Sequence, residues 1–115
     1  LSDRLTPWNK IEERLRASAK GDFSIVIYNP ESKSRYGYLK KACESIADII
    51  PEKRACGYVK NIGRPGQAAF VCTFSELQEI HADMFTTVFI GNTMTYIKDG
   101  KLITMRGYKS EVKDE

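Results

Sequence analysis

The chain has 115 residues, of which 42% are hydrophobic, and a formal net charge of +3 from 18 basic and 15 acidic residues. This length and hydrophobic content fit one domain with one core and exclude an intrinsically disordered segment. Because basic and acidic residues are interspersed, we expect no nucleic-acid partner. No apolar run is long enough to cross a bilayer, so we expect no membrane partner either.

The start of the chain and its cysteines bear on its origin and redox state. It begins Leu1-Ser2-Asp3-Arg4, with neither an initiator Met nor a signal peptide, which indicates a processed or excised piece of a longer protein. Cys43, Cys56 and Cys72 form no CxxC pair, which favours reduced, partly buried thiols over disulfides. The single histidine, His81, completes no usual zinc site, so we expect no metal.

The first half of the chain predicts two helices around one strand. Thr6-Pro7 begins a helix in which apolar residues recur every three or four positions, and Gly21 ends it. Residues 23–28 form a continuous, β-branched apolar run, which predicts a strand covered on both faces. Residues 39–50 carry a second helical pattern.

The second half is dominated by strands. They are predicted over residues 56–60, 68–73 and 86–90, and over the two arms, 93–98 and 101–105, of a hairpin that turns at Asp99-Gly100. A short helix is predicted through residue 80, capped by Thr73 or Ser75. The order of elements predicts an α/β fold: a three-layer-like sandwich with a mixed sheet of about five strands and helices on its faces. The sheet is expected to be parallel at its centre and antiparallel at one edge, with the hairpin at the C-terminal end.

Two polar turns follow predicted strands and are candidate ligand loops. Tyr28-Asn29-Pro30 comes directly after residues 23–27, and residues 61–67 follow the next strand. Open α/β sheets bind ligands at the carboxyl ends of their strands. A purely structural role fits each turn equally well, with Gly63 and Gly66 supplying positive φ angles.

The sequence offers little for covalent or acid–base catalysis. The single histidine does not by itself define a Ser-His-Asp catalytic triad. Neither of the phosphate-binding motifs GxxxxGK[ST] and GxGxxG occurs. Amides, hydroxyls and small residues in the turns suit binding of a small polar molecule through hydrogen bonds. The catalytic residues stay unknown at this level.

Several short segments follow one another in a characteristic order. They are Leu1-Ser2-Asp3, Leu5-Thr6-Pro7-Trp8, Tyr28-Asn29-Pro30 with Ser32-Lys33 and Arg35, Val59-Lys60-Asn61-Ile62-Gly63-Arg64, Asp83-Met84, Thr86-Thr87-Val88, Ile90-Gly91-Asn92, Asp99-Gly100, Thr104 and Arg106-Gly107-Tyr108. Taken together, these segments resemble the tetrapyrrole methylases, and within them the precorrin-3B C(17)-methyltransferase branch of cobalamin biosynthesis. The resemblance covers nearly the whole chain.

The resemblance implies half of an enzyme. Members of this family look like two α/β domains that hold S-adenosylmethionine in the cleft between them. By this resemblance, the glycine-rich N-terminal cofactor domain would be absent here. Residues 1–115 would be the C-terminal domain, inactive when isolated. Carried over residue by residue, the cofactor-binding positions are Tyr28, Asn29, Pro30, Asn61, Ile62, Gly63, Thr86 and Thr87.

The resemblance also implies a substrate and partners. The methyl acceptor would be a carbon of a polycarboxylate tetrapyrrole, a precorrin or cobalt-factor, whose carboxylates Lys33, Arg35 and Arg64 would pair with. For each of these three residues, a hydrated surface side chain with no role in substrate binding is an equal alternative. A cytoplasmic homodimer is expected. Two other hypotheses stay open: a non-catalytic module that binds a small ligand or a partner, and a fragment of a related methylase with another substrate.

Overall fold

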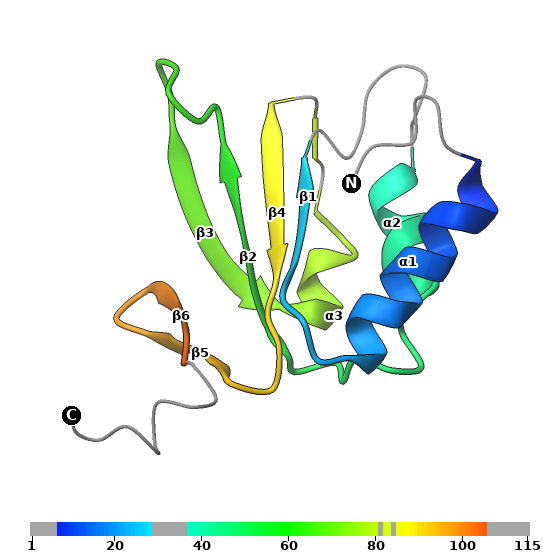
Figure 1. Cartoon of the computed structure of the whole chain (residues 1–115). Coiled ribbons are helices and arrows are strands. Elements are labelled where there is room, and N and C mark those ends of the chain that lie inside the picture. The colour runs from blue at the N-terminus through cyan, green and yellow to red at the C-terminus, as the bar shows by residue number, and fades with distance from the viewer. Residues whose placement is uncertain (1–6, 29–36, 81, 84, 106–115) are drawn as a thin grey trace.

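The computed structural model describes residues 7–28, 37–80, 82–83 and 85–105. Within these ranges, three helices and six strands follow one another (Figure 1). They are α1 (Trp8–Lys20), β1 (Ile25–Tyr28), α2 (Tyr38–Glu44), β2 (Ala55–Lys60), β3 (Ala68–Thr73), α3 (Phe74–Leu77), β4 (Thr86–Ile90), β5 (Thr95–Lys98) and β6 (Lys101–Thr104). The predicted α/β class and the C-terminal hairpin are confirmed.

The main sheet is antiparallel, which corrects the predicted mixed sheet. Its four described strands lie in the order β1-β4-β2-β3, and β5 and β6 form a separate two-stranded sheet. Each neighbouring pair of these described strands is antiparallel. β1 and β2 do run in the same direction, as the helix between them suggested. However, β4 lies between them and pairs with both, so the expected parallel contact does not form.

The hydrophobic core lies on one face of the sheet, which also corrects the predicted three-layer arrangement. Ile11 and Leu15 of α1 pack in one cluster with Ile27 of β1, Val88 of β4 and residues of α2 and α3. In Figure 1 the three helices lie to the right of the sheet, and the β5-β6 hairpin lies at the lower left. The other face of the sheet therefore has no helix layer among the described elements.

The hairpin packs on that other face, over a glycine of β2 that lies close to the backbone of β3. Gly57 alternates along β2 with Cys56 and Tyr58, whose side chains face the core. A Cβ atom at Gly57 would lie 3.6 Å from a side-chain carbon of Leu102 and only 2.8 Å from the carbonyl oxygen of Phe70. A Cβ atom at this position would therefore collide with the backbone of β3, whereas it would meet Leu102 of the hairpin at an ordinary van der Waals distance.

β1 is buried on one face only, contrary to the prediction that it is covered on both. Ile25 and Ile27 are buried, Val26 is half-buried, and the Tyr28 side chain is 59% exposed. This alternation follows from the position of β1 at the edge of a sheet whose helices lie on a single face.

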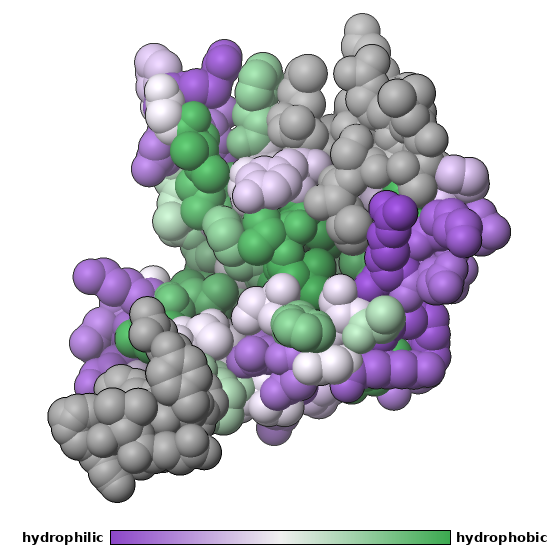
Figure 2. All heavy atoms as spheres, in the orientation of Figure 1, coloured by the Kyte–Doolittle hydropathy of each residue, from purple (hydrophilic) through white to green (hydrophobic). Residues whose placement is uncertain are grey.

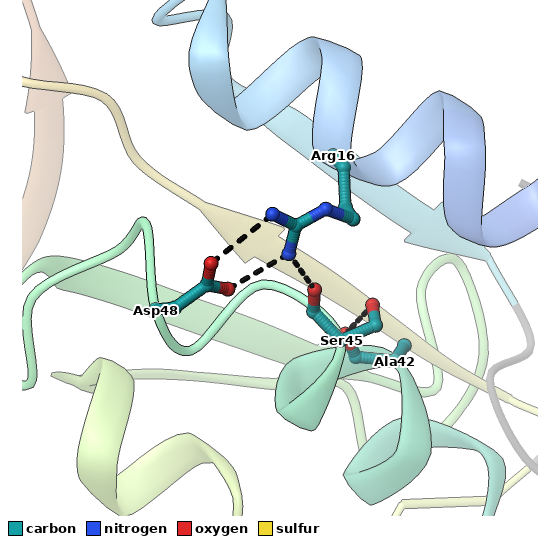
Figure 3. Close-up of polar contacts among 4 residues, drawn as sticks. All are labelled: Arg16, Ala42, Ser45 and Asp48. Atoms are coloured by element: carbon teal, nitrogen blue, oxygen red, sulfur yellow. Dashed lines mark hydrogen bonds and ion pairs between the residues drawn. The ribbon is translucent and has the colours of Figure 1, made fainter.

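α2 ends at Glu44, earlier than the predicted residue 50, and polar contacts explain the ending (Figure 3). The Ser45 hydroxyl donates to the Ala42 carbonyl oxygen at 2.7 Å, in competition with helical hydrogen bonds. Arg16 of α1 donates to the Ser45 carbonyl oxygen at 2.8 Å and to both carboxylate oxygens of Asp48 at 2.8 and 3.1 Å. The guanidinium thus ties α1 to the turns that follow α2.

Thr73, rather than Ser75, caps α3. The Thr73 hydroxyl accepts a hydrogen bond from the Glu76 N–H at 3.2 Å, and the Thr73 N–H donates to the Glu76 carboxylate at 2.9 Å. This reciprocal pair satisfies two backbone donors at once. It also fixes the direction in which the chain leaves β3.

We expect Thr73→Ala to lower the free energy of unfolding by about 1 kcal/mol, because the helix loses its N-terminal acceptor. Thr73→Ser keeps the hydroxyl and serves as the matched control, expected to stay close to the wild type. Urea denaturation followed by circular dichroism measures both. Equal losses in the two variants would show that the methyl group, and not the cap, carries the effect.

Asp22 joins the turn after α1 to the segment before the hairpin. Its backbone has a φ of +62°, and its carboxylate accepts hydrogen bonds from the N–H of Thr93, at 2.9 Å, and from the Thr93 hydroxyl. The Asn92 side-chain amide donates to the Asp22 carbonyl oxygen at 3.1 Å. The hydrogen bonds from Thr93 lower the pKa of the Asp22 carboxyl group below its ordinary value.

A lowered pKa in the folded state makes this contribution to stability sensitive to acid. It is complete above the unfolded pKa of about 4 and disappears as the pH falls through the folded pKa. We expect Asp22→Asn, which tolerates the same backbone conformation, to melt a few degrees below the wild type at pH 7. Thermal melts across pH should show this gap closing toward pH 2. A gap that stays constant over that range would contradict the assignment.

Candidate functional site

Three strand ends meet at one end of the main sheet, the upper end in Figure 1. Tyr28 at the end of β1 lies opposite Thr87, and Lys60 at the end of β2 lies opposite Thr86. The Asn61 N–H donates to the Phe85 carbonyl oxygen at 3.0 Å, which joins the turn after β2 to the start of β4. We call this region the site end of the sheet.

The structure therefore brings several of the predicted cofactor-binding residues together, though for a different reason from the one expected. The prediction relied on neighbouring parallel strands. Here β1 and β2 point the same way because each is antiparallel to β4, and β4 starts where they finish. Asn29, Pro30, Lys33 and Arg35 lie outside the described residues, so their roles stay predictions.

The turn after β2 is held by its own residues. Asn61, Gly63 and Gly66 have φ angles of +58°, +72° and +86°. The Asn61 side-chain amide donates to the Gly66 carbonyl oxygen at 3.3 Å, and the Gly63 N–H donates to the Gln67 side-chain oxygen at 2.7 Å. The structural alternative for this turn thus has direct support, and any ligand would meet a preformed loop. Ile62 lies in the same turn with 51% of its side chain exposed.

The two adjacent threonines face opposite sides of the sheet. Thr86 is fully buried, and its hydroxyl donates to the Asp83 carboxylate at 2.9 Å while accepting from the Asp83 N–H at 3.1 Å. This hydroxyl is committed to shaping the turn before β4. The Thr87 residue is 8% exposed on the face away from the helices. It makes no side-chain hydrogen bond with any residue that the structure describes.

The face of the sheet opposite the helices, which we call the open face, is mostly apolar around Thr87. Tyr28 of β1 and Val59 of β2 flank Thr87 in one row, and Val26 and Phe89 lie in the next row. Figure 2 shows hydrophobic residues gathered in a hollow near the centre of the view, above the hairpin. An aromatic ring, a hydroxyl and aliphatic side chains suit a flat, largely apolar ligand with a few polar groups.

Asp83 and Phe85 contribute to the site end, although the sequence analysis did not select them as site residues. The Asp83 carboxylate accepts from the Phe85 N–H at 2.9 Å as well as from the Thr86 hydroxyl. The Phe85 ring lies beneath the Arg64 guanidinium, 4.1 Å from its carbon to the ring centroid. An Asp that bonds the backbone two residues on is the signature of an Asx turn, and the Asp83-x-Phe85-Thr86 spacing carried that signal.

The described cysteines offer no nucleophile. Cys43 and Cys56 are buried, Cys72 is half-buried, and all three are free thiols in the structure. Burial raises the pKa of Cys43 and Cys56 to about 12 and that of Cys72 to about 11, so the thiols stay protonated at neutral pH.

Within the described ranges, no group of three or more His, Cys, Asp and Glu residues is placed to hold a metal ion. None of the helices described here is long and apolar enough to cross a membrane.

Comparison with known proteins identifies relatives along nearly the whole chain. The probable cobalt-factor III C(17)-methyltransferase of Salmonella typhimurium is 40% identical over 108 residues, which cover 94% of this chain and 45% of that protein. The protein of the same name from Methanocaldococcus jannaschii is 40% identical over 119 residues, or 97% and 48% of the two chains. The precorrin-3B C(17)-methyltransferase of Sinorhizobium sp is 38% identical over 103 residues, or 88% and 41%.

The chain is homologous to the cobalt-factor III and precorrin-3B C(17)-methyltransferases. The resemblance seen in the sequence is thereby confirmed. The crystal structure of the methyltransferase CobJ matches with a TM-score of 0.79 and 33% identity, over 91% of this chain and 44% of that one. This chain spans less than half the length of each of these relatives. No family model matches it.

The left-handed backbone at Asn61 gives a test of the preformed turn. We expect Asn61→Ala to lower the free energy of unfolding by roughly 1–2 kcal/mol, because a Cβ without a local hydrogen bond disfavours positive φ. Asn61→Gly accepts the same φ and should lose much less stability. Urea denaturation of both variants, with the exposed helix position Asn9→Ala as control, measures the difference. If Gly is no better than Ala, the side-chain bond to Gly66, and not the backbone, dominates.

Proposed function

We propose that this chain is the C-terminal domain of an S-adenosylmethionine-dependent C(17)-methyltransferase of cobalamin biosynthesis. The observation that carries the proposal is the 40% identity to the Salmonella typhimurium relative over 94% of this chain. The convergence of Tyr28, Asn61 and Thr87 at the site end supports it, because these are positions that the resemblance assigns to the cofactor. A preceding glycine-rich domain would complete the cleft.

The residues at the site end fit a sulfonium cofactor. The polar groups offered by Tyr28 and Thr87 are neutral hydroxyls, and the Asp83 carboxylate is engaged by the Phe85 N–H and the Thr86 hydroxyl. Neutral acceptors and an aromatic ring suit a cation better than basic side chains do. When bound, the cofactor supplies a methyl group already activated for attack by an electron-rich carbon. Tyr28, Asn61 and Thr87 would hold it.

The contribution of this chain to the reaction is positioning. Thr87 as a residue is only 8% exposed, and its hydroxyl has no described partner, so this hydroxyl is available to bind a ligand polar group. Val59 and Ile62 would exclude water from the same end of the sheet. Holding two reactants in attack geometry is worth roughly 7–11 kcal/mol of the barrier, which requires no covalent or metal assistance from the residues described here.

The acceptor in this proposal is the substrate class that the names of the relatives print, precorrin-3B or cobalt-factor III. Arg64 would pair with its carboxylates, together with Lys33 and Arg35 if these lie nearby. A cytoplasmic location and a homodimer are parts of the same proposal. The dimer is expected because the open face leaves apolar surface that a second copy would cover.

Methyl transfer and cofactor binding test this proposal together. We expect the chain preceded by an N-terminal methylase domain to methylate cobalt-factor III or precorrin-3B, and the 115-residue chain alone to show no turnover. In the two-domain protein, Thr87→Val should weaken binding of S-adenosylhomocysteine by roughly 5- to 10-fold, because one hydrogen bond is lost without a change in shape. Isothermal titration calorimetry measures the affinity.

The matched control is Thr104→Val, which removes an exposed hydroxyl of the hairpin whose partner is the Thr95 hydroxyl at 2.7 Å. It should leave cofactor affinity unchanged. Full turnover by the 115-residue chain would overturn the half-cleft assignment. Binding of the tetrapyrrole by the two-domain protein without methyl transfer would support a non-catalytic module, and transfer to a different acceptor would support a related methylase.

A further inference from the structure

Arg64 and Phe85 form a cation–aromatic pair at the rim of the site end. The guanidinium carbon of Arg64 lies 4.1 Å from the centroid of the Phe85 ring. The two residues come from different segments, the turn after β2 and the start of β4. Each is a near neighbour in sequence of a position assigned to the cofactor, Asn61 for Arg64 and Thr86 for Phe85.

The backbone around this pair is fixed on both sides. The Phe85 N–H donates to the Asp83 carboxylate at 2.9 Å, and the Phe85 carbonyl oxygen accepts from the Asn61 N–H at 3.0 Å. The Arg64 N–H donates to the Asn61 carbonyl oxygen at 2.9 Å, and its own carbonyl oxygen accepts from the Gln67 N–H at 3.2 Å. The backbone of Asn61 is therefore hydrogen-bonded to the backbones of both Phe85 and Arg64.

Stacking on a ring orients a guanidinium while leaving its donors available. The Arg64 guanidinium carbon lies over the Phe85 ring, and a guanidinium that stacks on a ring keeps its N–H donors free around its edge. No described carboxylate lies within ion-pair distance of Arg64, and the residue is exposed. The result is a fixed fork of donors with no anion from the described part of the chain, a geometry that matches a carboxylate in bidentate fashion.

We infer that Phe85 is a positioning residue that holds the Arg64 guanidinium ready to bind a carboxylate of the tetrapyrrole acceptor. The inference rests on the proposed function, and it deepens that function by naming a residue that sets substrate recognition. Phe85 touches no substrate in this scheme and acts through Arg64. A polar surface loop would not need an exposed aromatic ring at this position, whereas a platform for a cation does.

The test uses uroporphyrin, a tetrapyrrole that carries carboxylates around its whole periphery, as the probe for the 115-residue chain. We expect Arg64→Ala to weaken binding roughly 10-fold and Arg64→Lys, which keeps the charge but loses the fork, to weaken it by an intermediate amount. Phe85→Leu should weaken it about 3-fold, and Phe85→Trp, which keeps an aromatic face, should restore wild-type affinity. Fluorescence titration gives each dissociation constant.

A second cation–aromatic pair in the helix layer provides the matched control. The Lys41 ammonium lies 4.2 Å from the centroid of the Trp8 ring, so Lys41→Ala removes a cation from an equivalent contact. It should not change uroporphyrin affinity. Rescue by Trp but not by Leu at position 85 separates positioning of Arg64 from a general packing role, because both variants keep a large apolar side chain and only Trp keeps an aromatic face.

The outcomes separate this inference from the proposed function. Unchanged affinity in Arg64→Ala, equal affinity of the Leu and Trp variants at position 85, or no saturable binding by the wild type each overturns the inference. Titration of the two-domain protein with S-adenosylhomocysteine is independent of this pair. Normal cofactor binding there with no effect of Arg64→Ala would leave the proposed function standing. If the two-domain protein fails to bind S-adenosylhomocysteine and Arg64→Ala has no effect on uroporphyrin binding, the proposed function and this inference are both overturned.

Discussion

The pairing of β4 with β1 on one side and β2 on the other is the constraint on which this molecule depends. β4 is antiparallel to both strands. The carboxyl ends of β1 and β2 and the start of β4 therefore lie at the same end of the sheet. The turn after β2 is then tied to the start of β4 by the Asn61–Phe85 backbone hydrogen bond at 3.0 Å. Every described site residue is placed by this arrangement, and the helices contribute only the layer against which the sheet packs.

Side-chain alternation along β4 divides the work between neighbouring residues. Thr86 points into the layer that also holds Val88 and Ile90, and its hydroxyl closes the turn with Asp83. Thr87, one residue later, lies on the open face beside Tyr28. A slip of one position in the register of β4 would exchange these two roles, so the cross-strand pairing is as important to the site as the residues themselves.

Local sequence patterns predicted the elements better than their arrangement. The run of β-branched and aromatic residues at 86–90 and the Asp99-Gly100 turn specify a strand and a hairpin from nearby residues alone, and both are confirmed. The position of β4 between β1 and β2 depends on contacts far apart in sequence, so the expectation of a parallel centre was wrong. Phe85 was missed as a site residue for the same reason, because its partner Arg64 belongs to another loop.

The three native thiols have a practical consequence for studying the molecule. With pKa values raised to about 11 or 12, Cys43, Cys56 and Cys72 are ionised at neutral pH to roughly one part in ten thousand or less. A cysteine introduced at an exposed position such as Ile62 would ionise far more readily. Maleimide dyes or spin labels can therefore be directed to the turn after β2 while the native cysteines stay in place.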